Sequence, residues 1–309
     1  MHVFVTGATG FVGAAVVEQC LQQGHQVTGL IRDPAKATTL TRQGMVPQLG
    51  DMASPQTYLP IVSTVDAVIQ TAQLGVKGRF TQANKAKINQ ADEAMTLALA
   101  RACIEQDKIL IYTSGCFNYG DHGAEWIDER TPATPSPLGE GHAQVVAQLM
   151  DMYKRENLKL LVLSPGFVYG PGGLFKTSFY DTLQKGQLRV FGKGQNYWSP
   201  IQVEDLARAY GAALVHGRYG EVYNIVDDKP LTLRQLVDAI TSAQGVKSVG
   251  SIPGWLISLL IGGPLIKSLT SSFRVSNAKA KRELKWQPQH GSFEVGIKGV
   301  LAQLNQKTA

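Results

Sequence analysis

Apolar, β-branched runs alternate with helical patterns through the first half of the chain. The runs read HVFVT, HQVTGLI, DAVIQTA, KILIYTS and LKLLVLS, and stretches with helical spacing of apolar residues separate them. This alternation is typical of a parallel sheet that carries helices on both faces. The pattern therefore predicts an α/β protein with a doubly wound parallel sheet. A long helix over 83–103, rich in Ala and Leu, is expected to cover that sheet.

The pattern changes after Pro165. Gly-rich loops, short strands and separated helices follow, and 201–227 reads as one more helix and strand. We predict a sheet domain over 1–170, to which 201–227 returns. A smaller C-terminal domain would comprise 171–200 and 228–309, with a cleft between the two.

The most apolar late segment is GWLISLLIGGPLI, at 254–266. It is too short to span a bilayer, which takes about 20 residues. We therefore expect this segment to be buried, or to line a pocket together with Trp198 and Trp255.

The sequence TGATGFVG follows the first strand directly and opens a helix. Gly7 permits a tight turn, Gly10 lets the backbone approach a pyrophosphate, and Gly13 allows close packing of helix on strand. The amide groups of the first helical turn then meet the phosphates. The predicted phosphate-binding residues are Gly7, Thr9, Gly10, Phe11, Val12 and Gly13.

Charge and cysteine content narrow the picture further. The 309 residues include 30 Lys and Arg against 24 Asp and Glu, a formal net charge of +6 that suits an anionic cofactor. The one dense basic run, KAKRELK, alternates with Ala, Glu and Leu, as a solvated helix face does, so no nucleic-acid partner is expected. Three widely spaced cysteines predict neither a disulfide framework nor a metal site. The N-terminus lacks the pattern of a signal peptide, which predicts a cytoplasmic protein.

Several motifs together carry a family resemblance. GATGFVG, the Gly50-Asp51 pair, YTSGCFNYG, SPGFVYGPGG and IQVEDLARA resemble the extended short-chain dehydrogenase/reductase superfamily, the NAD-dependent epimerase/dehydratase-like group. The likeness covers essentially the whole chain. It implies that 1–170 is a dinucleotide-binding Rossmann domain of about seven strands, with bound NAD or NADP, and that the smaller C-terminal domain binds the substrate. It also implies further cofactor contacts: Asp51 and Met52 beside the adenine, Ala72 near the cofactor, and Pro165, Phe167 and Val168 beside the nicotinamide ring.

The end of the second strand bears on the choice of cofactor. NAD-binding relatives usually carry an acidic residue where Ile31 stands, and Ile31 cannot accept hydrogen bonds from a ribose. Arg32, the next residue, can fork onto a 2'-phosphate. NADP is therefore favoured, with NAD left open, and Asp33 is expected to cap the helix that starts at Pro34.

The residues that perform the chemistry in active members are replaced here. The resemblance places Gly115 at the usual serine, Leu138 at the tyrosine and His142 at the lysine of the Tyr-x-x-x-Lys pair. Histidine has an ordinary pKa of about 6.5 and would often be neutral where lysine is charged. We take His142 as the first candidate catalytic residue. Ser114 is the second, although strand alternation would point it away from the side of Gly115.

Two hypotheses about function follow. The first is an atypical extended-type enzyme that binds NADP and acts on a small organic substrate, as an oxidoreductase or an epimerase/dehydratase-like enzyme. The second is a catalytically inactive protein of the same fold that senses NADP(H) or interacts with a partner. A small-molecule substrate is expected, a membrane span is not, and a homodimer is left open.

Overall fold

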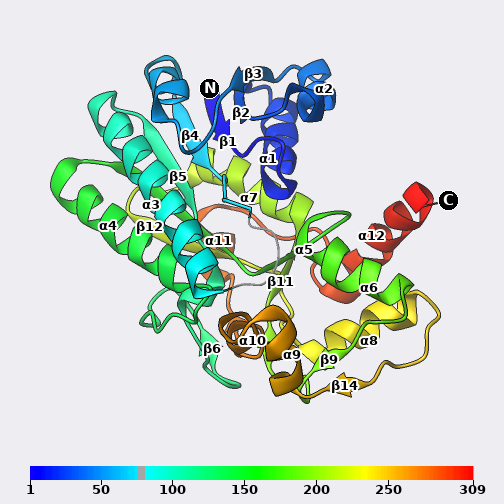
Figure 1. The fold of residues 1–309 in the computed structure, drawn as a ribbon. Helices are drawn as coiled ribbons and strands as arrows, with labels where there is room; N and C mark the ends of the chain where they lie inside the picture. The colour runs from blue at the N-terminus through cyan, green and yellow to red at the C-terminus, as the bar shows by residue number, and fades with distance from the viewer. Residues whose placement is uncertain (76–80, 309) are drawn as a thin grey trace.

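A computed structural model of the protein describes residues 1–75 and 81–308. Its centre is a seven-stranded parallel sheet in the order β12-β7-β5-β4-β1-β2-β3 (Figure 1). The strands are β1 (His2–Thr6), β2 (Gln26–Ile31), β3 (Val46–Leu49), β4 (Ala67–Gln70), β5 (Ile109–Thr113), β7 (Lys159–Pro165) and β12 (Glu221–Ile225). The chain starts at β1 and winds outward in both directions, so the strand order reverses between β1 and β4. Ligands of doubly wound sheets bind at such a reversal, and the predicted fold class is confirmed.

Side chains that alternate along the strands divide the core between two layers of helices. Val3 and Val5 pack with α1 (Phe11–Gln22), α2 (Pro34–Arg42) and α7 (Val203–His216) on one face. Phe4, between them, packs with α3 (Gln82–Glu105) and α4 (Glu140–Glu156) on the other. Because both faces are covered, the central strands β1, β4, β5 and β7 are mostly apolar. The helix predicted over 83–103 is α3, and it covers the sheet as expected.

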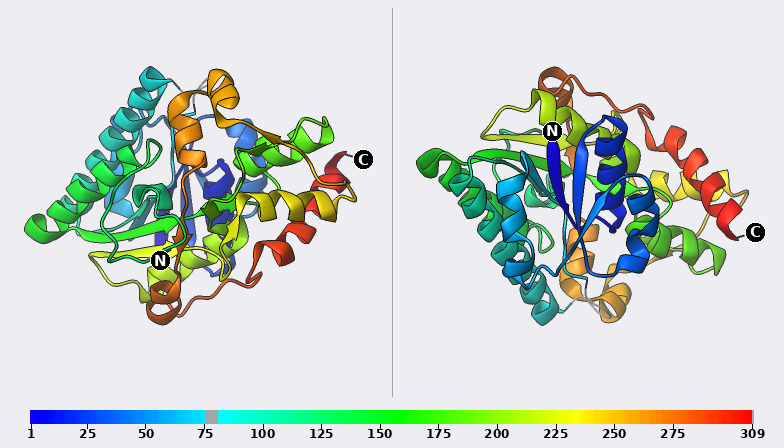
Figure 2. Two further views of the ribbon diagram at one scale, coloured as in Figure 1. Left: turned by 90° about the horizontal axis from the view of Figure 1, so that it is seen from below. Right: turned by 90° about the horizontal axis from the view of Figure 1, so that it is seen from above.

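A second core lies in the C-terminal half of the chain. It gathers buried aromatic and aliphatic side chains from short strands and from α8 (Leu233–Ala243) and α12 (Phe293–Thr308). Figure 2 shows these two helices on the opposite side of the molecule from α3 and α4. The segment of α7 and β12 belongs to the first core, and β12 joins the central sheet beside β7. The domain boundaries given above stay a prediction.

The remaining elements are short. They are η1 (Pro55–Thr57), η2 (Leu59–Thr64), η3 (Cys116–Asn118), β6 (Trp126–Ile127), β8 (Phe167–Tyr169), α5 (Gly173–Phe175), η4 (Lys176–Tyr180), α6 (Asp181–Gln184), β9 (Val190–Phe191), β10 (Tyr197–Trp198), β11 (Pro200–Gln202), β13 (Leu231–Thr232), β14 (Ser251–Ile252), α9 (Gly254–Ile261), α10 (Gly263–Leu269), β15 (Arg274–Val275) and α11 (Ala278–Glu283). Four two-stranded pairs, β8 with β11, β9 with β14, β6 with β15 and β10 with β13, connect them.

The apolar segment at 254–266 differs from the prediction. Trp255, Leu256 and Leu259 on α9 are exposed, with Trp255 at 67%. The expectation that this segment is buried or lines a pocket is wrong for these residues, because an apolar composition does not determine what packs against a helix. Within the part of the chain that the structure describes, no helix has the length and apolar character to cross a bilayer.

The three cysteines are free and buried, each in a different cluster of side chains. Cys20, on α1, packs with residues of α7 and the sheet. Cys103 is on the buried side of α3, and Cys116 packs with Phe117 and Phe273. Burial raises the pKa of Cys20 and that of Cys103 to about 12. Burial also raises the pKa of Cys116, with a further contribution from Glu129. Cys116 is the small buried residue that its position in the loop suggests.

Candidate active site

The glycine loop between β1 and α1 has the geometry of a phosphate-binding turn. Gly7 has a φ of +66°, and the backbone N–H of Gly10 donates to the carbonyl of Gly7 at 2.8 Å. A Cβ added at Gly10 would meet, among the described atoms, only the Gly7 oxygen, at 3.0 Å. A Cβ at Gly13 would collide with the Gly7 carbonyl and would lie 2.8 Å from the Thr71 hydroxyl. Gly10 thus keeps the surface of the loop open, and Gly13 permits the packing behind it.

A cleft of about 630 Å³ opens in front of this loop, at the point where the strand order reverses. This volume is in the range of cofactor sites. Of the residues predicted from the sequence, those that line it are Gly7, Thr9, Gly10, Phe11, Val12, Gly13, Arg32, Met52, Ala72, Ser114, His142, Pro165, Phe167 and Val168. The structure therefore brings the two predicted catalytic candidates and nearly all predicted cofactor contacts into one cleft. Their roles stay predictions.

One end of the cleft carries charged side chains of both signs. Arg32, Asp33 and Lys36 line it, and the Arg32 side chain is 70% exposed. Asp33 caps α2 as predicted, because its carboxylate accepts from the backbone N–H of Ala35 at 3.0 Å. Asp51 lies beside this end, 4.0 Å from Arg32, and its carboxylate accepts from the Ala53 N–H at 2.9 Å. Lys36 was not predicted to line the cleft. Its place in the first turn of the helix that Asp33 caps could have indicated this.

His142 lies in the first turns of α4 and takes part in a buried hydrogen-bonded network. Its Nδ1 is 2.7 Å from the hydroxyl of Tyr112 on β5, and that hydroxyl donates to Oδ2 of Asp92 on α3 at 2.6 Å. The Nε2 atom is 3.4 Å from the amide nitrogen of Gln73, which also lines the cleft. The His142 side chain is 20% exposed. The histidine is thus held from behind, while its other nitrogen faces the cleft.

Burial and charge act in opposite directions on the groups of this network. Burial lowers the pKa of His142, and the nearby Asp92 carboxylate raises it in part. Burial raises the pKa of Asp92, while His142 and the hydrogen bonds from Tyr112, Gln70 and Thr96 lower it. Burial and the adjacent Asp92 raise the pKa of Tyr112 well above its ordinary value. Tyr112 is therefore a neutral hydrogen-bonding group here.

The three replaced positions lie together in the same cleft. Gly115, Leu138 and His142 all line it, as the family alignment predicts. A side chain at Gly115 would have room, since the nearest atom to an added Cβ is the Pro165 carbonyl oxygen, at 3.9 Å. Leu138 offers no proton, so the residues at these three positions provide only one titratable group, His142.

Ser114 also lines the cleft, contrary to the expectation that it would face away from the side of Gly115. Sheet pairing continues to Ser114, whose N–H donates to the Leu163 carbonyl at 2.8 Å, and alternation places Ser114 on the same side as Tyr112, whose hydroxyl contacts His142. Its hydroxyl oxygen accepts from the Asn118 amide at 2.8 Å. The hydroxyl retains its own proton for a further hydrogen bond.

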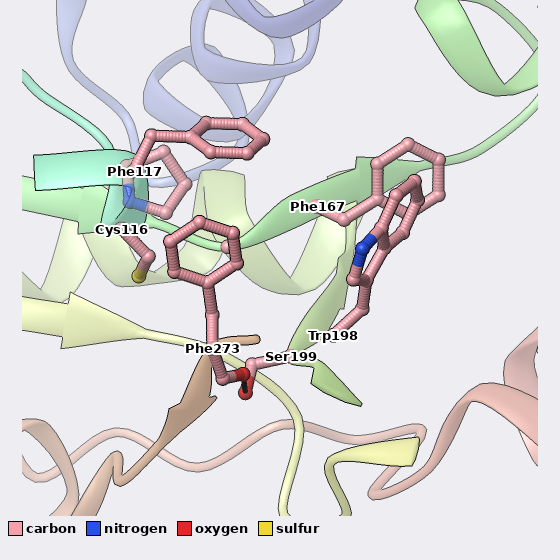
Figure 3. A pocket seen from close by; sticks show the side chains of 8 residues that line it. Cys116, Phe117, Phe167, Trp198, Ser199 and Phe273 are labelled. Carbon is pink, nitrogen blue, oxygen red and sulfur yellow. Dashed lines mark hydrogen bonds between the residues drawn. The ribbon is translucent and has the colours of Figure 1, made fainter. Parts of the chain in front are cut away.

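A small apolar pocket shares walls with the cleft beside Pro165 and Phe167. Figure 3 shows the rings of Phe117 and Phe273 on one side and those of Phe167 and Trp198 on the other. The first two rings meet edge to face with centroids 4.9 Å apart, and the second two are 4.8 Å apart. The cavity measures about 20 Å³, room for one small group.

The polar atoms around this pocket are directed into the protein. The indole N–H of Trp198 donates to the Leu269 carbonyl at 3.2 Å, and the Ser199 hydroxyl donates to the Phe273 carbonyl at 2.8 Å. None of the described lining residues is charged. The pocket therefore suits an apolar, uncharged part of a ligand. Trp198 lines it as predicted, whereas Trp255 is exposed on α9.

The network around His142 was not predicted, but Asp92 left a signal in the sequence. Asp92 stands in register with Met95, Thr96 and Leu99 on the buried stripe of α3. A carboxylate on the apolar face of a helix costs free energy unless it is paired, so it indicates a buried polar network. Its partners could not be named without the fold.

Comparison with known proteins agrees with this description. The model of the NAD dependent epimerase/dehydratase family matches residues 3–226. A 3-diazoavenalumate denitrifying reductase from a Streptomyces species is 26% identical over 308 residues, which cover 96% of this chain and 99% of that protein.

Two solved structures share the fold over nearly the whole chain. Human epimerase family protein SDR39U1 (isoform 2) with NADPH has a TM-score of 0.81 and 19% identity, and the match covers 98% of this chain and 100% of that chain. dTDP-glucose 4,6-dehydratase from Bacillus anthracis in complex with NAD has a TM-score of 0.83 and 20% identity, with 99% and 97% covered.

Proposed function

The chain belongs to the NAD dependent epimerase/dehydratase family, and from this premise we propose that it is an NADP(H)-dependent reductase of a small electrophilic substrate. His142 serves as its proton donor in place of the usual tyrosine. The observation that carries the proposal is that His142, held by Tyr112 and Asp92, presents its Nε2 to the predicted cofactor cleft. The names of the relatives support the reaction class, since one of them is a reductase.

The cofactor fits the residues of the cleft. The open surface at Gly10 leaves room for phosphates to meet the backbone amides at the start of α1. Arg32 and Lys36 supply positive charge at the end where a 2'-phosphate would lie, which favours NADP over NAD. Pro165, Phe167 and Val168 would border the nicotinamide. NADPH, when bound, supplies a hydride to the substrate.

The proton balance determines what His142 does. Reduction adds a hydride and a proton to the substrate, so the Nε2–H of the protonated ring gives up its proton and the neutral ring is protonated again from solvent. A lone imidazole is a weaker arrangement than a tyrosine beside a lysine and a serine. We therefore expect an electrophile more reactive than a simple ketone, such as an activated carbonyl compound.

The apolar pocket bears on the shape of the substrate. Pro165 and Phe167 line both this pocket and the cleft, where they are predicted to border the nicotinamide. A methyl-sized apolar substituent on the reacting carbon would fit there, and a phosphate or a sugar ring would not.

The test is oxidation of NADPH, followed by absorbance, with α-diketones and quinones as substrates and simple ketones as the comparison. We expect turnover of the activated compounds and a large loss of rate in His142→Gln with NADPH binding retained. If the native protein binds NADPH and reduces none of these compounds, the reductase proposal fails and the inactive NADP(H)-binding protein becomes the better account. Equal rates for the native protein and His142→Gln would remove His142 from the chemistry.

A further inference from the structure

We propose that Asp92 and Tyr112 are positioning residues that hold His142 as the tautomer with its proton on Nδ1, so that the Nε2 lone pair faces the cleft. The catalytic meaning of this arrangement rests on the function proposed above. The tautomer itself does not, because it follows from the hydrogen bonds of the folded chain.

The neighbours of Gln70 determine the orientation of its side-chain amide. Its Nε2 lies 3.1 Å from the carbonyl oxygen of Ala72 and 3.1 Å from Oδ1 of Asp92, both of which accept hydrogen bonds. The Thr96 hydroxyl donates to the same Oδ1 at 3.4 Å. With the Tyr112 hydroxyl on Oδ2, Asp92 accepts from every one of these partners. We take Asp92 as ionised, the state in which it accepts from all of these partners.

The single proton of the Tyr112 hydroxyl is then committed. It is donated to Oδ2 of Asp92 at 2.6 Å, which leaves only lone pairs for the contact with Nδ1 of His142 at 2.7 Å. A hydrogen bond needs a proton, so Nδ1 must carry it. In the neutral ring Nε2 is therefore bare, and it can accept from the Gln73 amide nitrogen, 3.4 Å away.

The arrangement is built from three elements that the fold brings together. Asp92 comes from α3, Tyr112 from the central strand β5, and His142 from α4. Asp92 and Tyr112 are 3% and 0% exposed, so water does not compete for their hydrogen bonds. In catalytic triads a carboxylate orients the imidazole by a direct hydrogen bond. Here the carboxylate of Asp92 would orient His142 through the phenol of Tyr112.

The consequence is a histidine that meets the cleft as a proton acceptor while neutral and as a proton donor once protonated. In the other neutral tautomer Nε2 carries the proton. That tautomer would turn an N–H toward the cleft, and Nε2 could not accept a further proton. Removing the carboxylate should therefore change the tautomer without removing the histidine.

The experiment is ¹⁵N NMR of the imidazole nitrogens, with the His142 signals assigned from their loss in His142→Gln, in the free protein and in the NADPH complex. In the native protein we expect the ¹⁵N chemical shift of Nδ1 to be that of a protonated nitrogen and the shift of Nε2 to be that of an unprotonated one. In Asp92→Asn the new amide can donate to the Tyr112 oxygen, which frees the phenol proton for Nδ1, so the two nitrogen shifts should exchange types. In Tyr112→Phe the Nδ1 atom keeps only the longer contact with Oδ2 of Asp92, at 3.5 Å, so the Nδ1–H form should be less strongly favoured than in the native protein.

Tyr210→Phe is the matched control. Tyr210 is fully buried, and its hydroxyl pairs with Thr113 Oγ1 at 2.6 Å, one residue along β5 from Tyr112. This variant should leave the His142 shifts unchanged. A native protein with the proton on Nε2, or an Asp92→Asn protein that keeps it on Nδ1, would overturn the inference.

Because the NMR measurement needs no turnover, the two proposals fail separately. Absence of NADPH oxidation by the native protein contradicts the proposed function and leaves the tautomer result standing. The wrong tautomer in a protein that turns over contradicts the positioning role alone.

Discussion

Gly10 and Gly13 stand three residues apart at the start of α1, and the structure predicts opposite outcomes for the same substitution. At Gly13 an added Cβ would collide with the backbone carbonyl of Gly7. Neither group is at the end of a flexible side chain, so α1 must shift on β1. Overpacking of this kind costs about 1–3 kcal/mol. At about 2–4 °C per kcal/mol, Gly13→Ala should lower the melting temperature by roughly 2–12 °C.

At Gly10 the added Cβ faces the cleft and meets the Gly7 oxygen at 3.0 Å, which a shift of a few tenths of an ångström relieves. Gly10→Ala should therefore cost about 1 kcal/mol or less in the free protein. Its effect appears with cofactor, because the methyl group occupies the surface that the phosphates approach. At 100 times its Kd a ligand stabilises the fold by about 2.7 kcal/mol, and a tenfold loss of affinity removes about 1.4 kcal/mol of that.

The assay is thermal unfolding with and without NADPH for the native protein, both variants and Gly299→Ala. Gly299 lies within α12, exposed, and no atom of the described chain that is not its own neighbour would come within 4 Å of an added Cβ. This control should be up to about 1 kcal/mol more stable than the native protein and keep the full NADPH shift. A Gly10→Ala protein with an undiminished NADPH shift would refute the phosphate-binding role. A Gly13→Ala protein as stable as the native one would refute the packing argument.

The remaining predictions concern the two ends of the cleft. Arg32→Ala should remove the larger thermal shift that NADPH gives relative to NADH, and equal shifts already in the native protein would contradict the NADP assignment. The reduction rate should rise as pH falls through the pKa of His142, which burial lowers below its ordinary value, because the protonated ring is the donor; a rate that rises with pH instead would exclude that role. Leu138→Tyr combined with His142→Lys should not restore reduction of simple ketones, whereas adding Gly115→Ser should, since a side chain fits there and positioning and proton transfer act together. Full activity of the double variant would show that the hydroxyl introduced by Gly115→Ser is not needed.

The parts of this protein that the sequence predicts well are those specified by residues close together in the chain. The loop from Gly7 to Gly13 and the cap at Asp33 each follow from a few adjacent residues, and both have the expected geometry. The alternating strands predict the sheet, although β3, a short edge strand that contains Pro47, gave too weak a pattern to be recognised.

The parts that were missed depend on contacts between distant segments. Asp92 and Tyr112 are 20 positions apart, and Tyr112 and His142 are 30 apart, so no local pattern joins them. Ser114 was misplaced because the side of β5 that borders the cleft depends on how His142 of α4 packs against Tyr112. The exposure of Trp255 likewise depends on which elements pack nearby.

The three buried cysteines provide built-in reporters of how the protein opens. Only a thiolate reacts quickly with an alkylating reagent, and burial keeps each of these thiols protonated and out of reach in the native state. Labelling therefore requires local or global opening at the cysteine concerned. Because Cys20, Cys103 and Cys116 lie in separate clusters, their labelling rates would report separately on the layer of α1 and α7, the layer of α3 and the aromatic region beside the active site. Slower labelling of one cysteine on addition of NADPH would then show which region the cofactor stabilises.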